Sequence, residues 1–235
     1  MGRRIRPMLL GILGIAFAMG AGEAKGDEFY YVMIFGSQSS PKLLRYTHTW
    51  ATFIRAVGEG PDATNYAVVQ HTISWLPETL DVKVWNPRPE PGVNLDLYGT
   101  LNVVQQDRER VTMWGPFRIL PEVYQRSLRV KGILDSGAAE YRAISTSRNL
   151  LISDCIHAVA AVDPVFGRNH YPLIRIGKPA SRFIARQMMT RSVFDQWQED
   201  HSWLVPRLGL DRYSVEVIPP RQIPKENCFL CRIPE

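Results

Sequence analysis

The chain has 235 residues, of which 45% are hydrophobic and 22% are charged, and its formal net charge is +5 at pH 7. These values predict a globular protein with a core of ordinary size, and they exclude a disordered chain. The sequence has no internal repeat and no low-complexity tract, which excludes a solenoid or an array of short repeats.

The N-terminal residues have the pattern of a secretory signal. Arginines within residues 3–6 precede an uncharged apolar stretch over residues 8–19, and the small residues Gly22 and Ala24 suit cleavage after Ala24. We expect residues 1–24 to be a signal peptide and residues 25–235 to form a single α+β domain. The protein is then exported to the periplasm, the cell envelope or the exterior, and it contacts a membrane only through the signal, if that is uncleaved.

Loss of the signal removes part of the positive charge. Residues 25–235 contain 25 basic and 22 acidic side chains, which gives a net charge of about +3. The arginines are scattered along the chain and not gathered into a run, so the sequence gives no indication of a nucleic-acid partner. It also lacks a P-loop and a dinucleotide-binding motif, so we expect no cofactor.

The first part of the mature chain is rich in strands. Residues 29–35 form a continuous apolar run that predicts a buried strand, and residues 47–57 alternate as in a strand. The even-numbered residues 48–54 of that second strand share one face, and the odd-numbered residues share the other. Residues 65–75 predict a third strand, antiparallel to the second, and residues 82–85 a weaker one.

The later part of the chain is richer in helices. Asn94 is expected to cap a helix through residue 106, Pro121 to open a helix to about residue 134, and Ser153 or Asp154 to cap a helix that begins at Cys155. Together these elements predict an α+β fold, an antiparallel sheet with helices packed on it. The other expected strands cover residues 110–114, 139–144, 171–176 and 213–218, and the other expected helices cover 179–189 and 192–208.

Cys155 is the residue that most suggests chemistry. Cys228 and Cys231 form a C-x-x-C near the end of the chain, which we interpret as a local disulfide or a pair of free thiols, and Cys155 is left without an obvious partner. A helix N-terminus favours a thiolate, which is the nucleophilic form of cysteine. The alternative is that Cys155 is a small buried hydrophobic residue.

His48 and His71 are candidate partners for this thiol. They lie on the two strands expected to pair, so both side chains are candidates to meet on one face of the sheet. One imidazole would take the thiol proton, and the other would orient it. The alternative for each is a half-buried histidine bonded to a backbone carbonyl.

This order of residues resembles the circularly permuted NlpC/P60 group of papain-like thiol hydrolases. Its lecithin:retinol acyltransferase branch has Asn-Cys-Glu-His-Phe-Val at the nucleophile, and this chain has Asp-Cys-Ile-His-Ala-Val over residues 154–159. The resemblance implies a papain-like core with Cys155 as nucleophile, His48 as base and His71 as orienter. It also implies a supporting role for His157.

The chain departs from that branch at position 154. Asp154 stands where the branch has asparagine, and a carboxylate beside the thiol would raise the thiol pKa. The segments 45–53, 71–77 and 113–116 also resemble uncharacterised exported bacterial proteins, a likeness that implies no activity.

The first functional hypothesis is a cysteine-dependent hydrolase or acyltransferase. The Cys155 thiolate would attack an amide or ester, and the amides of the helix N-terminus would stabilise the oxyanion. Related enzymes act on cell-wall peptides or lipid acyl groups, so a cell-wall peptide or a lipid is the expected partner. Trp50 and Trp75, together with Trp85 and Trp114, are candidates to line a substrate groove or to pack in the core.

Two other hypotheses remain open. The protein is alternatively a non-catalytic, exported, envelope-associated binding module that keeps a papain-like fold, because a catalytic thiol must survive in an oxidising compartment. A zinc site made by His48, His71 and Cys155 is a further alternative. The sequence has no His-x-x-x-His or His-Glu-x-x-His spacing, so we predict no metal.

Overall fold

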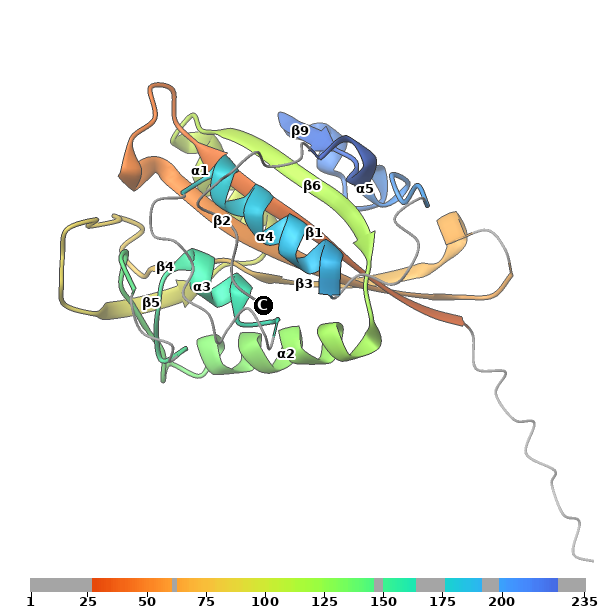
Figure 1. Ribbon diagram of the computed structural model, residues 1–235, viewed down its shortest axis with the longest axis horizontal. Coiled ribbons are helices and arrows are strands. Elements are labelled where there is room, and N and C mark those ends of the chain that lie inside the picture. Colours follow the sequence, from red (N-terminus) through yellow and green to blue (C-terminus); the bar gives the residue numbers. More distant parts are fainter. Residues whose placement is uncertain (1–26, 61–62, 146–149, 164–175, 192–198, 224–235) are drawn as a thin grey trace, which may run out of the picture.

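The computed structural model describes residues 27–60, 63–145, 150–163, 176–191 and 199–223 (Figure 1). The expected signal, residues 171–175 of one expected strand, and the C-x-x-C of Cys228 and Cys231 lie outside the described residues. Among the helices that are described, none combines the length and the apolar character needed to cross a bilayer.

Five strands make up the main sheet, in the order β3-β2-β1-β6-β9. Its neighbours are antiparallel except for β6 and β9, which are parallel. The predicted antiparallel pairing of the second and third strands is confirmed. The strands are β1 (Asp27–Gln38), β2 (Thr47–Gly58), β3 (Ala67–Ile73), β6 (Arg110–Arg118) and β9 (Val215–Ile218).

A smaller sheet lies beside the main one, in the order β4-β5-β7-β8. The strand expected over residues 82–85 is wrong, because that segment forms turns between β4 and β5, and Trp85 in it is exposed. The next strand, β5, begins at Glu90. The four strands are β4 (Trp75–Pro77), β5 (Glu90–Asn94), β7 (Glu140–Tyr141) and β8 (Ile152–Ser153).

The helices begin at identifiable caps. In α1 the cap is Asp96, whose carboxylate accepts the Gly99 N–H at 2.6 Å, and the expected cap Asn94 instead ends β5. Pro121 occupies the first turn of α2, as predicted. The helices are α1 (Leu97–Gln106), α2 (Pro121–Asp135), α3 (Cys155–Ala160), α4 (Lys178–Arg191) and α5 (Leu204–Arg207).

The helix expected over residues 192–208 is confirmed in its described part only over Leu204–Arg207. Residues 199–203 are not helical, and α5 has only four residues. Pro206 lies inside this segment, and a proline lacks the N–H that a longer helix needs. Short 3-10 helices cover Leu44–Tyr46 (η1), Ala63–Asn65 (η2), Leu210–Arg212 (η4) and Pro220–Gln222 (η5).

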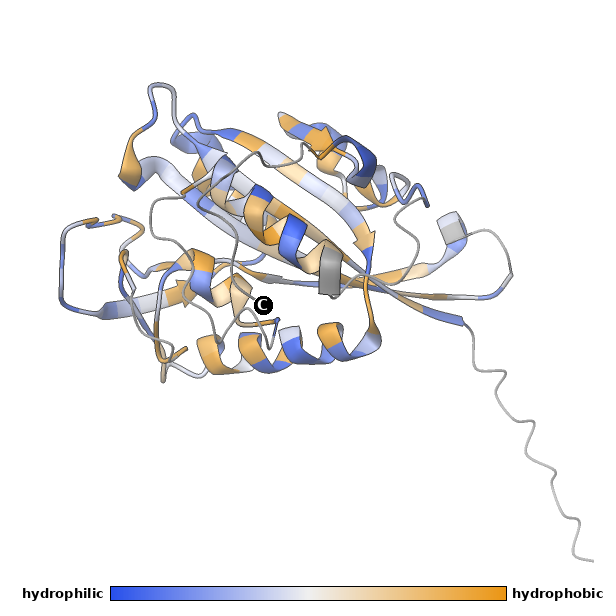
Figure 2. Cartoon of the chain, in the orientation of Figure 1, coloured by the Kyte–Doolittle hydropathy of each residue, from blue (hydrophilic) through white to orange (hydrophobic). Residues whose placement is uncertain are grey.

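Hydrophobic side chains pack on both faces of the main sheet, which makes the fold α+β as predicted. On one face, Phe35, Trp50 and Ile54 pack with α1 and α5, and we call this the α1 face. On the other, Val32 and Phe53 pack with α2, α3 and α4, and we call this the α3 face. Figure 2 shows hydrophobic and hydrophilic residues alternating along α2, as expected for a helix with one buried side.

Candidate functional site

Asp154 fixes the start of α3, the helix that carries Cys155. One carboxylate oxygen accepts the N–H groups of Ile156 at 2.9 Å and His157 at 2.8 Å, and the other accepts the Ser145 N–H at 3.2 Å. Because these donors would otherwise be unpaired at a helix N-terminus, Asp154 determines where α3 begins. The predicted cap and the predicted first-turn position of Cys155 are therefore confirmed.

The Cys155 thiol lies on the α3 face, where it meets the β2 backbone at Thr49. Burial, and after it the negative charge of the nearby Asp154 carboxylate, raises the pKa of this thiol to about 12. Hydrogen bonds from the backbone of Thr49 and of the helix start act in the opposite direction but do not outweigh burial. At neutral pH the sulfur is therefore a thiol and not the thiolate that nucleophilic attack requires.

His48 lies on the opposite face of the sheet from Cys155, so its predicted role as base is wrong. Its side chain shares the α1 face with Trp50 and stacks on that ring at 5.3 Å. Its Nε2 lies 2.9 Å from the Ser74 hydroxyl oxygen, and burial lowers its pKa to about 3. The physical reason is the alternation of a strand: Thr49 faces the thiol, so His48 points away from it.

His71 shares a face with Cys155 but lies at a different point along the sheet. It is paired in register with Phe53, four residues along β2 from Thr49, which corresponds to about 13 Å of strand. Its Nε2 lies 2.8 Å from the Ser127 hydroxyl, which itself donates to the Tyr124 carbonyl. The predicted orienting role of His71 is therefore wrong.

The zinc hypothesis fails for the same geometric reason. His48 and Cys155 are on opposite faces of the sheet, so they do not share a metal ion. Within the described ranges, no group of three histidine, cysteine or acidic side chains is close enough together to hold one.

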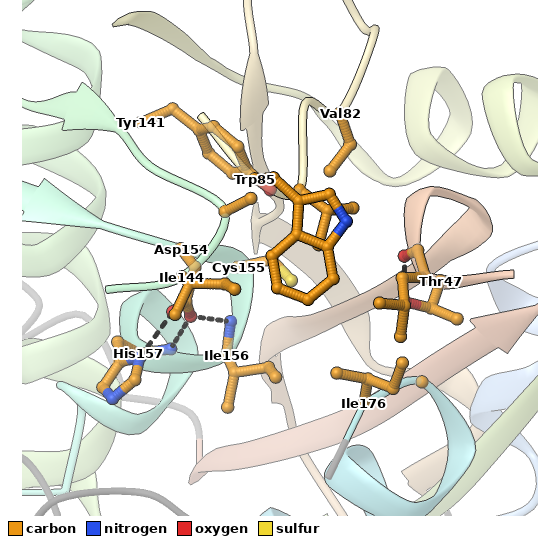
Figure 3. Close-up of a pocket in the computed structure, with 14 residues that line it drawn as sticks. Thr47, Val82, Trp85, Tyr141, Ile144, Asp154, Cys155, Ile156, His157 and Ile176 are labelled. Atoms are coloured by element: carbon orange, nitrogen blue, oxygen red, sulfur yellow. Dashed lines mark hydrogen bonds and ion pairs between the residues drawn. The ribbon is translucent and has the colours of Figure 1, made fainter. Parts of the chain in front are cut away.

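His157 is paired with Asp154 and not with the thiol. Its Nδ1 lies 2.7 Å from an Asp154 carboxylate oxygen, and Figure 3 shows its ring projecting away from the Cys155 sulfur. Burial by itself would lower the pKa of His157, but the bond to Asp154 and its negative charge raise the pKa above the ordinary histidine value. The pair supports the helix start, and it does not supply a base to Cys155.

The prediction that Trp50 and Trp75 line a substrate groove is also wrong. Trp50 and Trp75 are fully buried in the two cores, where they have no access to a ligand. Trp85 is the opposite case, because 81% of its surface is exposed. A large exposed aromatic ring beside a cavity is typical of a binding surface, since burying it on binding is favourable.

A cavity of about 190 Å³ lies beneath Trp85. Figure 3 shows the indole of Trp85 lying across this cavity, with the Cys155 sulfur beside it. Most of the wall could not be predicted from the sequence, because its residues come from five separate segments of the chain. The lining residues are Leu44, Thr47, Val82, Val84, Trp85, Tyr141, Ala143, Ile144, Asp154, Cys155, Ile156, His157, Ile176 and Gly177.

Comparison of the chain with models of known families, with curated proteins and with solved structures finds no match. The resemblance to the permuted NlpC/P60 group therefore stays a prediction. What can be said of the site comes from its own geometry.

Proposed function

We propose that this protein is an exported, non-catalytic binding module that holds a small apolar group in the pocket between Trp85 and Cys155. The observation that carries the proposal is the Trp85 indole, which is exposed to solvent yet lies over a cavity with a mainly aliphatic wall. Such a ring and wall would lose contact with water when an apolar group enters.

The size of the cavity indicates the size of the group. A cavity of about 150 Å³ with a wall of Leu, Ile and Phe side chains holds a benzene molecule, and the present cavity measures about 190 Å³. A phenyl ring or a short branched aliphatic group therefore fits. Both partners expected from the sequence, a cell-wall peptide and a lipid, contain groups of this kind.

The positions of the two predicted partner histidines, both within the described residues, favour binding over catalysis. Neither His48 nor His71 reaches Cys155, and the thiol pKa of about 12 leaves almost no thiolate at pH 7. A papain-like core and export remain parts of the proposal. The packing of α3 on β2 supports the first, and the signal-like pattern of residues 1–24 supports the second.

The test is binding of a neutral aromatic probe, 3-phenylpropanamide, followed by calorimetry and by protein-observed NMR. We expect a dissociation constant below about 1 mM, in keeping with the affinity that a ligand of this size reaches in an apolar pocket. Trp85→Ala removes the ring over the cavity and should weaken binding by about tenfold or more.

Leu128→Ala is the matched control, since Leu128 is another exposed large hydrophobic residue but lies on α2 and does not line the cavity. This variant should bind the probe as the unaltered protein does. Equal binding by the Trp85→Ala variant, or no binding of the probe at all, would rule out the proposed pocket.

A further inference from the structure

We infer that the ligand of this pocket carries a carboxylate, and that Arg142 binds it on the far side of Trp85. The inference rests on the proposed function, because it names the chemical class of the ligand for the same site.

A second cavity adjoins the first. It measures about 270 Å³ and is bounded by Val84, Trp85, Asn86, Pro87, Arg142 and Ile144. Val84, Trp85 and Ile144 belong to both cavities, so Trp85 is part of the wall that the two neighbouring spaces share. A ligand that extends beyond the ring-sized group in the first cavity would enter the second one.

Two consecutive residues at the end of β7 line different cavities. Tyr141 lines the Cys155 cavity, and the next residue, Arg142, lines the second cavity. The backbone N–H of Arg142 donates to the Ser153 carbonyl at 3.1 Å, which fixes the position of the residue in the small sheet. The guanidinium is therefore held at the second cavity by the strand, and not by a contact of its own.

The Arg142 side chain has no partner within the part of the chain that the structure describes. Its Nε is buried and lacks a hydrogen bond. The nearest acidic residue on the neighbouring strand, Glu90, is already paired with Lys83 at 3.3 Å. A buried guanidinium N–H without an acceptor is unfavourable, and a ligand that supplies the acceptor removes this penalty.

A carboxylate is the anion that suits this place best. Its two oxygens match the fork of a guanidinium, which donates two parallel hydrogen bonds to a planar anion. Among the described residues that line the second cavity, Arg142 is the only cation. One positive charge balances a carboxylate, whereas a doubly charged phosphate monoester would keep an unpaired charge. The geometry therefore indicates an amphipathic carboxylate, with its apolar end beneath Trp85.

The experiment compares 3-phenylpropanoate with 3-phenylpropanamide on the full chain. The two probes share the ring and differ in charge. We expect the carboxylate to bind about tenfold more tightly than the amide at low salt, and this ratio to fall as salt is added. Arg142→Gln should reduce the ratio to about one, because it weakens binding of the carboxylate more than binding of the amide.

Arg129→Gln is the control for a general loss of positive charge, since Arg129 is exposed on α2 and lines neither cavity. This variant should keep the preference for the carboxylate. Equal affinities for the two probes, or a preference that survives Arg142→Gln, would overturn the inference while the proposed function stands. Failure of the amide itself to bind would instead remove the proposed function and this inference with it.

Discussion

At the scale of single residues, burial decides the chemistry of the two strand histidines. Burial lowers the pKa of His48 to about 3 and that of His71 to about 4. Below pH 6.5 or so the unfolded chain takes up protons that the folded chain excludes. The stability that these neutral rings provide is therefore present above that pH and is lost as the pH falls toward their folded pKa values.

Replacement of His48 tests this directly. His48→Gln keeps a polar group beside Ser74 but has no group that titrates at this position. The variant therefore does not lose the part of its stability that protonation of the unfolded His48 removes in acid. We expect its destabilisation relative to the unaltered protein to be smaller at pH 5 than at pH 8 by about 2 kcal/mol, measured by urea unfolding.

His157→Gln provides a control of opposite sign. The pKa of His157 is raised, so its contribution is present below pH 6.5 or so and is lost as the pH rises through the folded value. Destabilisation by this variant should be larger at pH 5 than at pH 8. A penalty for His48→Gln that does not change with pH would show that the His48 ring accepts a proton in the folded protein.

The reactivity of Cys155 is a second test at this scale. In a Cys228→Ser/Cys231→Ser background, where Cys155 is the one remaining cysteine, we expect iodoacetamide to label the folded protein at pH 7 at least about a hundredfold more slowly than free cysteine. The reason is the thiol pKa of about 12. His48→Gln should not alter the rate, which mass spectrometry would follow. Fast labelling that slows in the His48→Gln variant would restore the hydrolase hypothesis.

At the scale of elements, two helix caps differ in burial and in the number of bonds they accept. Asp154 is buried and accepts three backbone N–H groups at the start of α3. Asp96 is exposed and accepts one, from Gly99, at the start of α1. Because a buried donor that loses its acceptor finds no water, the first cap is worth more than the second.

We therefore expect Asp154→Ala to lower the free energy of unfolding by about 3 kcal/mol and Asp96→Ala by about 1 kcal/mol. Urea unfolding at pH 7 measures both values. Similar losses for the two variants would mean that α3 does not depend on its cap, and that Cys155 is positioned by the packing of α3 on β2 alone.

At the scale of the whole molecule, the docking of α4 on the main sheet requires two glycines. A Cβ added at Gly36 in β1 would lie 2.1 Å from the Ser181 hydroxyl oxygen and 2.9 Å from the Gly177 carbonyl oxygen. Gly177 has a φ of +61°, and a Cβ there would lie 2.7 Å from the Ser37 carbonyl oxygen. The backbone at the start of α4 thus approaches the sheet as closely as sterics permit.

Gly36→Ala should separate this helix from the sheet and lower the free energy of unfolding by about 2–4 kcal/mol. Gly132→Ala is the matched control, because no atom lies within 4 Å of a Cβ added there, in the middle of α2. That variant should be neutral or more stable by up to about 1 kcal/mol. A thermal melt of both variants checks the contrast, and a neutral Gly36→Ala would contradict the observed packing of α4.

Much of the local structure could be predicted from residue patterns. The apolar run over residues 29–35, the alternation over 47–57 and the proline at position 121 each identified an element. The segment 82–85 was misread, because the two valines on either side of Lys83 suit the wall of a cavity as well as a strand. No local sequence pattern identified Arg142 as a binding residue. Whether its side chain has a partner among the described residues depends on which segments of the chain surround it.

The sequence by itself determined that His48 and Thr49 point to opposite faces of β2 and that Cys155 opens a helix after a capping residue. Side-chain alternation and cap hydrogen bonds are local, so a few adjacent residues specify them. Only the tertiary structure decided which face α3 covers, and with it that the thiol meets Thr49 and an apolar cavity instead of an imidazole. Which face a helix covers depends on where the other helices pack, because together they must bury the apolar side chains of both faces. These helices are far apart in the chain, so no short segment specifies the outcome.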